Sequence, residues 1–175
     1  MGAVVVAAVA AATSSCGGAD GSEQTGPTGG APGGGIADAG EVAPDFRLPT
    51  LDGETVQLSE LRGHPVVVNF WASWCNPCRQ EFPLLDKAVR EHEKDGLVIV
   101  GVTFRDIESD SRDFVEETDA TWPQAVDDDG AVARTFGVRT IPVTFFVDAE
   151  GVVAARLFGF SSPDALEGPL RRILP

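Results

Sequence analysis

Two cysteines separated by two residues carry the strongest chemical signal in this sequence. They lie in the run Trp74-Cys75-Asn76-Pro77-Cys78, where an apolar segment meets a segment with helical spacing. The N-terminus of a helix at this junction would place partial positive charge near Cys75 and favour its thiolate. We therefore expect Cys75 to attack a disulfide in a partner protein. Cys78, one turn into the helix, would then resolve the mixed disulfide that forms.

The same pair of cysteines could instead form a structural disulfide or supply half of a zinc site. Tetrahedral zinc would need two further ligands, and the sequence offers only Cys16, His64 and His92, none of them suitably paired. The chain has three cysteines, an odd number, so at least one thiol stays outside any internal disulfide. The sequence therefore favours a redox role, with no metal and no cofactor besides a Cys75–Cys78 disulfide.

Buried strands that alternate with helices are expected to position this pair. Residues 66–71 form a short apolar run rich in β-branched side chains, typical of a strand buried on both faces, and lead directly to the cysteines. Residues 76–94 have apolar side chains at helical spacing, and Gly96 ends that pattern. We expect further strands over 97–104, 143–147 and 152–157, a hairpin over 46–58, and helices over 109–118 (capped by Ser109), over 131–136 and from Ser161 or Ser162 onward. This order predicts an α/β fold with a central mixed β-sheet flanked by helices and an N-terminal β-hairpin extension.

The first 41 residues have a different composition from the rest. An Ala/Val run over residues 3–12 precedes Cys16, which is the layout of an export signal and is too short to span a bilayer, where ~20 apolar residues are needed. This segment resembles a bacterial lipoprotein signal, which implies that Cys16 is lipidated; an ordinary secretory signal with an incidental Cys16 is the alternative. Residues 17–41 are rich in Gly and predict a flexible tether, and residues 42–175 predict the folded domain.

Charge and size exclude several classes of protein. The chain has 175 residues, 43% of them hydrophobic, which is enough for one buried core. It carries 27 Asp and Glu against 13 Lys and Arg, a net charge of −14, with no basic cluster that would bind phosphates. Nucleic acid is therefore not an expected partner.

Several motifs beyond the cysteine pair point to one family. Residues 42–175 resemble the TlpA/ResA-like branch of the thioredoxin superfamily, with a redoxin (AhpC/TSA-like) domain. The matching stretches are Ala43-Pro44-Asp45-Phe46, Leu58-Ser59-Glu60-Leu61-Arg62-Gly63, residues 68–78, Glu81-Phe82-Pro83, Phe136-Gly137-Val138 and Ile141-Pro142. The resemblance implies a thioredoxin-like fold for nearly the whole domain.

The resemblance also assigns roles to single residues. It implies that Pro142 follows a cis peptide bond beside the disulfide, and that Thr140 and Ile141 touch the partner chain. Glu81, one helical turn after Cys78, is implied to be a partly buried carboxylate that raises thiol pKa values and exchanges protons.

Two neighbouring positions complete the implied site. Asn69 stands where many thioredoxins have a buried Asp, and its amide cannot transfer a proton as that Asp does. Trp74 is expected to wall the disulfide, although tryptophans in such positions more often serve packing.

Two other motifs lack the residues that their chemistry would need. Asp127-Asp128-Asp129-Gly130 lacks the alternating ligands of an EF-hand-type calcium loop, so we expect a solvated acidic loop there. A peroxiredoxin would have Pro and Thr or Ser at fixed positions before its reactive cysteine, and relative to Cys75 those positions hold Val68 and Ala72.

Together these features predict an exported, membrane-anchored thiol-disulfide oxidoreductase that acts on protein thiols and disulfides outside the cytoplasm as a monomer. The resemblance implies a reductant in cytochrome c maturation, with apocytochrome c as substrate and a membrane thiol reductase as electron donor. Two alternatives stay open: an oxidase that forms disulfides in exported proteins, and a binding protein that handles copper or haem through the cysteine pair. The direction of the reaction depends on the reduction potential, which the sequence does not supply.

Overall fold

A five-stranded mixed sheet forms the centre of the fold. A computed structural model describes residues 37–175; the predicted export signal, Cys16 and the tether up to residue 36 lie outside the described residues. Strand β3 (Val66–Trp71) is the middle strand of the order β5-β4-β3-β6-β7. The strands β4 (Val98–Thr103) and β5 (Gln124–Ala125) continue the sheet in parallel on one side, and β6 (Val143–Val147) and β7 (Val153–Leu157) continue it antiparallel on the other.

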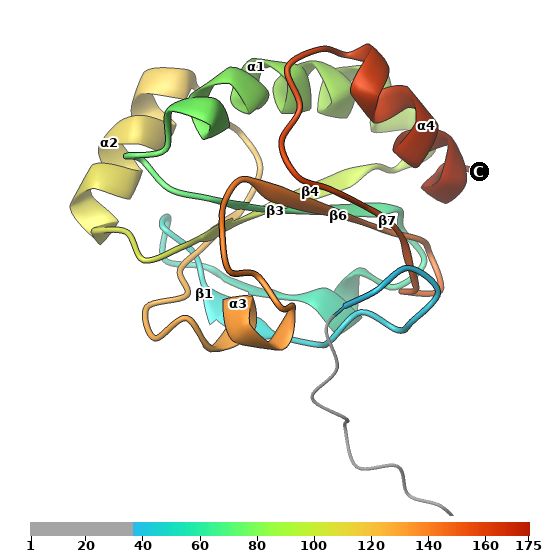
Figure 1. Cartoon of the computed structure of the whole chain (residues 1–175), viewed down its shortest axis with the longest axis horizontal. Helices are drawn as coiled ribbons and strands as arrows, with labels where there is room; N and C mark the ends of the chain where they lie inside the picture. Colours follow the sequence, from blue (N-terminus) through green and yellow to red (C-terminus); the bar gives the residue numbers. More distant parts are fainter. Residues whose placement is uncertain (1–36) are drawn as a thin grey trace, which may run out of the picture. The chain divides into compact units, whose positions relative to one another are not determined.

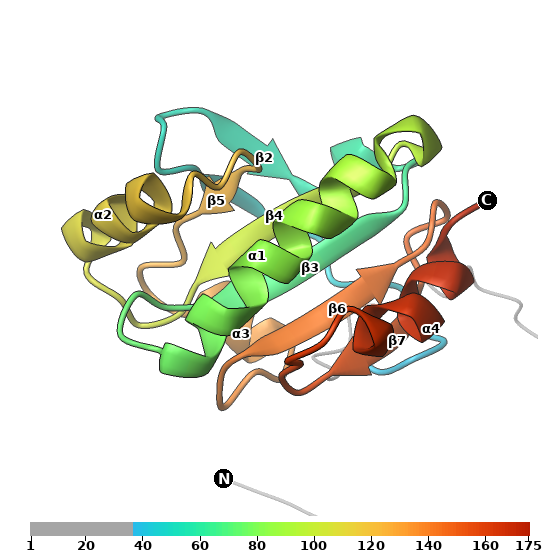
Figure 2. The same ribbon diagram turned by 90° about the horizontal axis from the view of Figure 1, so that it is seen from above.

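Helices cover one face of the sheet and a smaller layer covers the other (Figure 1). The covering helices are α1 (Asn76–Glu91), α2 (Glu108–Thr118) and α4 (Asp164–Ile173). Seen from above, α1 runs along the sheet over β3, between α2 and α4 (Figure 2). The opposite face carries α3 (Ala131–Thr135) and the predicted hairpin, formed by β1 (Arg47–Pro49) and β2 (Thr55–Gln57).

The apolar run of β3 supplies both faces of the core. Val66, Val68 and Phe70 belong to the cluster that packs against α3 and the hairpin. Val67 and Trp71 point to the opposite side and pack with the three covering helices. Because successive strand residues alternate between faces, a strand in this position has apolar side chains on both faces, as the sequence predicted; Asn69 is the one polar residue of β3.

One predicted helix cap is wrong, and the last helix begins later than predicted. Helix α2 begins at Glu108, so Ser109 lies inside its first turn and makes no capping bond. Helix α4 begins at Asp164 with Pro163 at its cap position and no side-chain cap from Ser161 or Ser162. In α4 the Ser162 carbonyl accepts from Ala165 N at 3.2 Å, so backbone groups rather than a hydroxyl start this helix.

The folded part begins earlier than residue 42. Ala37 is 1% exposed, and the backbone that follows it pairs with the edge strand β7. Gly40 N donates to Val153 O at 2.8 Å, and Val153 N donates to Glu41 O at 2.8 Å. Residues 37–41 therefore belong to the domain and not to the tether, because their backbone satisfies an otherwise open sheet edge.

The predicted solvated loop at residues 127–130 is partly buried. Asp127 is 2% exposed, and its carboxylate accepts from Val132 N at 3.1 Å and from Ala133 N at 2.8 Å. It therefore caps α3 and satisfies backbone N–H groups that the helix leaves unpaired.

Within residues 37–175, no helix is both long enough and apolar enough to span a bilayer.

Candidate active site

The two active-site cysteines are joined at the start of α1. The Cys75–Cys78 disulfide has an S–S distance of 2.02 Å, and the two Cα atoms are 5.3 Å apart. Cys75 is 4% exposed and Cys78 is completely buried. Cys75 is therefore the sulfur nearer to a partner, as the order of attack and resolution requires.

Local geometry explains why the helix begins here. Cys75 is the N-cap of α1, and its Sγ accepts a hydrogen bond from Cys78 N at 3.2 Å. Pro77 follows in the first turn, where a missing N–H costs nothing. In the reduced protein, the Cys78 N–H group and the positive end of the helix dipole favour a thiolate at Cys75.

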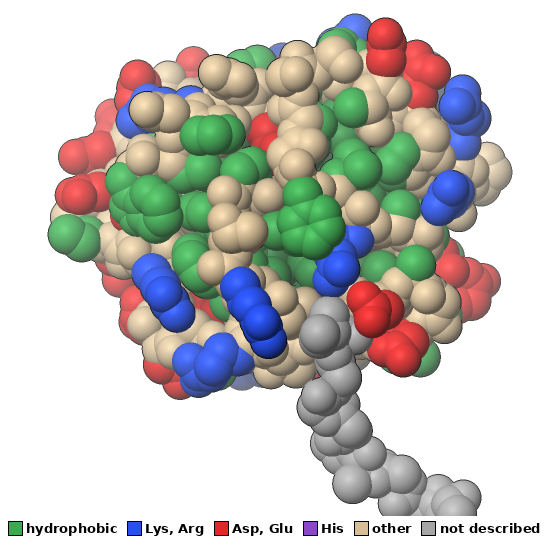
Figure 3. Space-filling view, in the orientation of Figure 1, with side chains coloured by type: hydrophobic (Ala, Val, Ile, Leu, Met, Phe, Trp, Pro, Cys, Tyr) green, Lys and Arg blue, Asp and Glu red, His purple; other side chains and the backbone are tan. Residues whose placement is uncertain are grey.

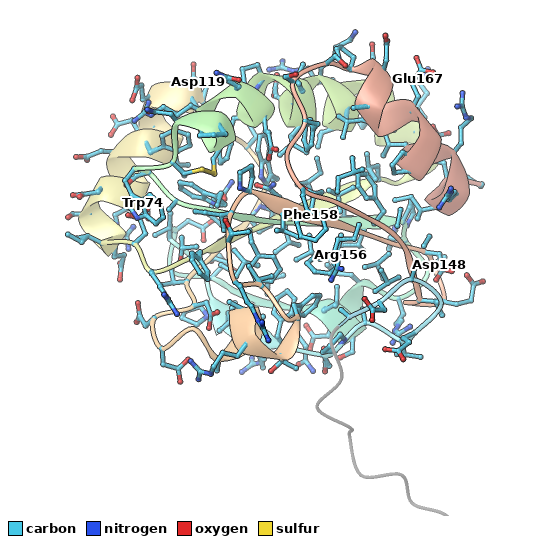
Figure 4. The ribbon with its side chains drawn as sticks, in the orientation of Figure 1. Trp74, Asp119, Asp148, Arg156, Phe158 and Glu167 are labelled. Atoms are coloured by element: carbon cyan, nitrogen blue, oxygen red, sulfur yellow. A yellow bond between two sulfur atoms is a disulfide. The ribbon has the colours of Figure 1, made fainter. Side chains whose placement is uncertain are left out.

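Asp106 fixes the segment that leads into Cys75. Its carboxylate accepts from Ser73 N at 2.6 Å and Ser73 Oγ at 2.9 Å, and from Ile107 N at 3.0 Å and Ser111 Oγ at 2.7 Å. One side chain thus ties the active-site loop to the start of α2. Trp74, labelled in Figure 4, is 59% exposed. Its Nε1 donates to Arg105 O at 3.3 Å, in the loop that also contains Asp106.

Replacing Asp106 with Ala is expected to lower the free energy of unfolding by about 2 kcal/mol, because two backbone N–H groups and two hydroxyls lose their acceptor. Urea titration of the oxidised protein measures this change. Asp113→Ala, at an exposed position of α2, is the matched control and should change the free energy of unfolding by less than about 0.5 kcal/mol. Equal effects of the two substitutions would contradict the role of Asp106.

Glu81 is a fully buried carboxyl group on the face of α1 that also carries Cys78. It is 0% exposed; its Oε1 accepts from Phe160 N at 2.9 Å and its Oε2 accepts from Asn69 Nδ2 at 3.1 Å. Burial raises the pKa of Glu81 to about 7, and the hydrogen bonds from Phe160 and Asn69 counter only part of that effect. A group with this pKa can take up and release a proton near neutral pH.

Asn69 connects this carboxyl group to the sheet. Its Nδ2 also donates to Thr144 Oγ1 at 2.8 Å, whereas its buried Oδ1 has no hydrogen-bond partner among the described residues. In this orientation the amide suits an ionised Glu81, which only accepts hydrogen bonds. Turned by 180°, the amide would present Oδ1 to a protonated Glu81 and to the Thr144 hydroxyl. The same Asn side chain can therefore satisfy both protonation states.

The predicted cis-proline is present and lies close to Glu81. The Ile141–Pro142 peptide bond is cis, and Pro142 is buried. Thr140 is exposed and Ile141 is half-buried against the apolar cluster that contains both cysteines. These positions leave Thr140 accessible to a partner.

Gly159, which sequence reasoning missed, lies beside both Glu81 and Pro142. It has a φ of +74°, and a Cβ at this position would lie 3.7 Å from Pro142 Cγ and 3.8 Å from Glu81 Oε1. The only signal in the sequence is a glycine between two phenylalanines after the last strand. A side chain here would need a strained backbone and would add bulk between the proline and the carboxyl group.

Among residues 37–175, no group of three or more His, Cys, Asp or Glu side chains is arranged to hold a metal ion. The reactive groups that the described site brings together are the cysteine pair and Glu81.

The chain is similar to known thiol-disulfide proteins. Residues 39–156 match the family model of the AhpC/TSA family. The thiol-disulfide oxidoreductase ResA of Bacillus cereus is 31% identical over 136 residues, which cover 78% of this chain and 79% of that protein. A solved structure assigned as a putative thiol:disulfide interchange protein DsbE of Chlorobium tepidum has a TM-score of 0.74 at 36% identity and covers 79% of this chain and 99% of its own. The exposed lipoprotein thioredoxin Etrx1 of Streptococcus pneumoniae has a TM-score of 0.65 at 33% identity, over 73% of this chain and 98% of that one.

These likenesses confirm the predicted thioredoxin-like fold and the predicted resemblance to ResA-like proteins. The structure itself pairs Cys75 with Cys78 at the N-terminus of α1. The chain therefore belongs to the AhpC/TSA family and is a thiol-disulfide oxidoreductase of the ResA type.

Proposed function

We propose that this protein is exported, anchored to the outer face of the membrane through a lipidated Cys16, and acts there as a protein-disulfide reductase. The observation that carries the direction of the reaction is the burial of Glu81 on the same face of α1 as Cys78. A carboxylate in that position disfavours a nearby thiolate and so raises thiol pKa values. Because oxidants of this superfamily stabilise their reduced form, a destabilised thiolate lowers the reduction potential and favours a reductant.

The proposed reaction moves two electrons to the partner. The Cys75 thiolate attacks one sulfur of a partner disulfide, which forms a mixed disulfide and releases one partner thiolate. Cys78 then gives its proton towards Glu81 and attacks the Cys75 sulfur. This step releases the second partner thiolate and leaves the Cys75–Cys78 disulfide. A membrane thiol reductase would return two electrons to this disulfide.

The proposed substrate is the oxidised haem-binding cysteine pair of an apocytochrome c. Support comes from the relative named DsbE among the solved structures and from ResA among the curated proteins, both thiol-disulfide enzymes by name. Support for the anchor comes from the relative named an exposed lipoprotein thioredoxin and from the position of Cys16 after the Ala/Val run.

A redox titration of the purified protein tests the direction. We expect a reduction potential well below that of strong oxidases, together with reduction of insulin disulfides. A high potential combined with oxidative refolding of a reduced protein would instead identify a disulfide-forming oxidase. Mass spectrometry of the protein from membranes tests the anchor, since lipidation adds acyl mass to Cys16, and an unmodified chain that begins after Cys16 would contradict it.

A further inference from the structure

Exposed apolar side chains gather around the disulfide. Among residues 37–175, the exposed large apolar side chains are Val42, Trp74, Ile107 and Phe158, and the last three belong to segments that border the active site. Trp74 directly precedes Cys75. Ile107 lies two residues after Arg105, whose carbonyl accepts the hydrogen bond from the Trp74 indole. Phe158 directly precedes Gly159, which lies beside Pro142. Figure 4 shows Trp74 and Phe158 on the same face of the domain. Such a surface suits an extended polypeptide on either side of a reactive cysteine.

Two exposed arginines border this apolar surface. Arg105 lies in the loop bonded to Trp74, and Arg139 directly precedes Thr140 and lines a groove of about 400 Å³ with Phe158. Within residues 37–175 neither guanidinium group forms an ion pair or a hydrogen bond; that of Arg105 lies 5.1 Å from the ring centroid of Phe104. In the space-filling view, basic side chains gather beside the apolar surface, towards α3 (Figure 3).

The carboxylates of the same segments are already engaged. Asp106 accepts from Ser73 and from the start of α2, and Glu108 pairs with Arg112. Asp38 Oδ1 lies 3.7 Å from Arg156 Nη1. The guanidinium group of Arg156 in turn lies over the ring of Phe158. The chain as a whole carries a net charge of −14, yet the guanidinium groups of Arg105 and Arg139, at the rim of this apolar surface, have no ion-pair partner among residues 37–175. The two guanidinium groups are thus available to pair with negative charge on a partner.

We propose that Arg105 and Arg139 select partner polypeptides that carry carboxylates beside the reactive cysteine pair, with apolar side chains resting on Trp74 and Phe158. The inference deepens the proposed function and rests on it. One exposed ion pair changes an equilibrium about two- to fivefold, so the two arginines together predict about a tenfold preference. The preference should fall as salt screens the charges.

The test uses the full chain with Cys16→Ser, so that only the active-site thiols react. The probes are synthetic peptides closed by one Cys-x-x-Cys disulfide, identical except for Glu, Gln or Lys on both sides of the cysteine pair. Stopped-flow tryptophan fluorescence measures the second-order rate constant for reduction of each peptide. We expect the Glu peptide to react about ten times faster than the Lys peptide at low salt and less than about three times faster at about 0.5 M salt.

Substitutions at the rim should remove this ratio. Arg105→Gln combined with Arg139→Gln is expected to bring the Glu/Lys ratio close to one, and the corresponding Lys substitutions should restore most of it. Arg90→Gln combined with Arg171→Gln removes the same charge from pairs on α1 and α4 and should leave the ratio unchanged. If the Glu/Lys ratio of reduction rates is unchanged in the Arg105→Gln, Arg139→Gln variant, or falls equally in the control, the inference is overturned while the proposed function stands. Failure to reduce even the Gln peptide would overturn the proposed function and the inference with it.

Discussion

Replacing Cys75 with Ser is expected to abolish disulfide exchange, with a loss of at least about a thousandfold in the rate of insulin reduction. The physical reason is that a hydroxyl at this N-cap keeps the hydrogen bond from Cys78 N but supplies no thiolate. Cys78 cannot replace it, because its side chain is completely buried and a partner disulfide cannot reach its sulfur. Insulin reduction with a catalytic amount of protein and excess reductant measures the loss.

Cys78→Ser separates attack from resolution and serves as the matched variant. It should keep the first step, because Cys75 is still at the entrance, and should then stop as a mixed disulfide with the substrate. Non-reducing gels and mass spectrometry would detect this adduct in the Cys78→Ser protein and not in the Cys75→Ser protein. Adducts at both positions in equal amount would contradict the order of attack that burial indicates.

The reactive part of the site could be predicted from the sequence because its residues are close along the chain. Cys75, Cys78 and Glu81 follow one another at helical spacing after a strand, so local pattern alone places them on one helix end. The middle strand was predictable for a similar reason, since a short apolar run rich in β-branched side chains, such as that from Val66 to Trp71, is typical of a strand buried on both faces.

The contacts that tune the site could not be predicted, because they depend on strand register and on loops that meet only in the folded chain. Asn69 meets Thr144 because β3 and β6 pair in the register that puts these two residues opposite each other. Asp106 reaches Ser73 across 33 positions of sequence, and Gly159 approaches Glu81 from the far end of the domain. Composition and periodicity contain no information on such pairings.

Glu81→Gln is expected to remove the pH dependence of the resolving step around pH 7 and to slow it about a hundredfold above that pH. The ionised Glu81, present above its pKa of about 7, accepts the Cys78 proton, whereas Gln cannot. A single-turnover experiment that starts from the mixed disulfide isolates this step from the ionisation of Cys75. Glu116→Gln, at an exposed position of α2, is the control and should keep the wild-type profile.

The same buried carboxyl group should also make the stability of the protein depend on pH, with a definite sign. Folded Glu81 keeps its proton up to about pH 7, whereas an unfolded Glu loses it near its ordinary value of 4.5. Between these two values the folded state binds more protons, so the free energy of unfolding falls as pH rises, by about 3 kcal/mol in total. Below pH 4.5 both states are protonated and this loss is absent. Asp52, whose pKa is held low by hydrogen bonds from the Thr50 hydroxyl and the Glu54 amide, acts in the opposite direction and only below its ordinary value of 3.8.

Urea titrations of oxidised wild type and Glu81→Gln at about pH 4.5 and about pH 8 measure this contribution. The difference between the two proteins cancels every other titrating group, so it should change by about 3 kcal/mol across the window, with the variant relatively more stable at the higher pH. In the variant, the amide oxygen at position 81 can still accept from Phe160 N. When the Asn69 side chain is turned by 180°, its Oδ1 can accept from the NH₂ group at position 81. The variant therefore leaves few polar groups unpaired. A difference that stays constant with pH would mean that the pKa of folded Glu81 is not raised above its ordinary value of 4.5, and would also contradict the predicted change in the resolving step around pH 7.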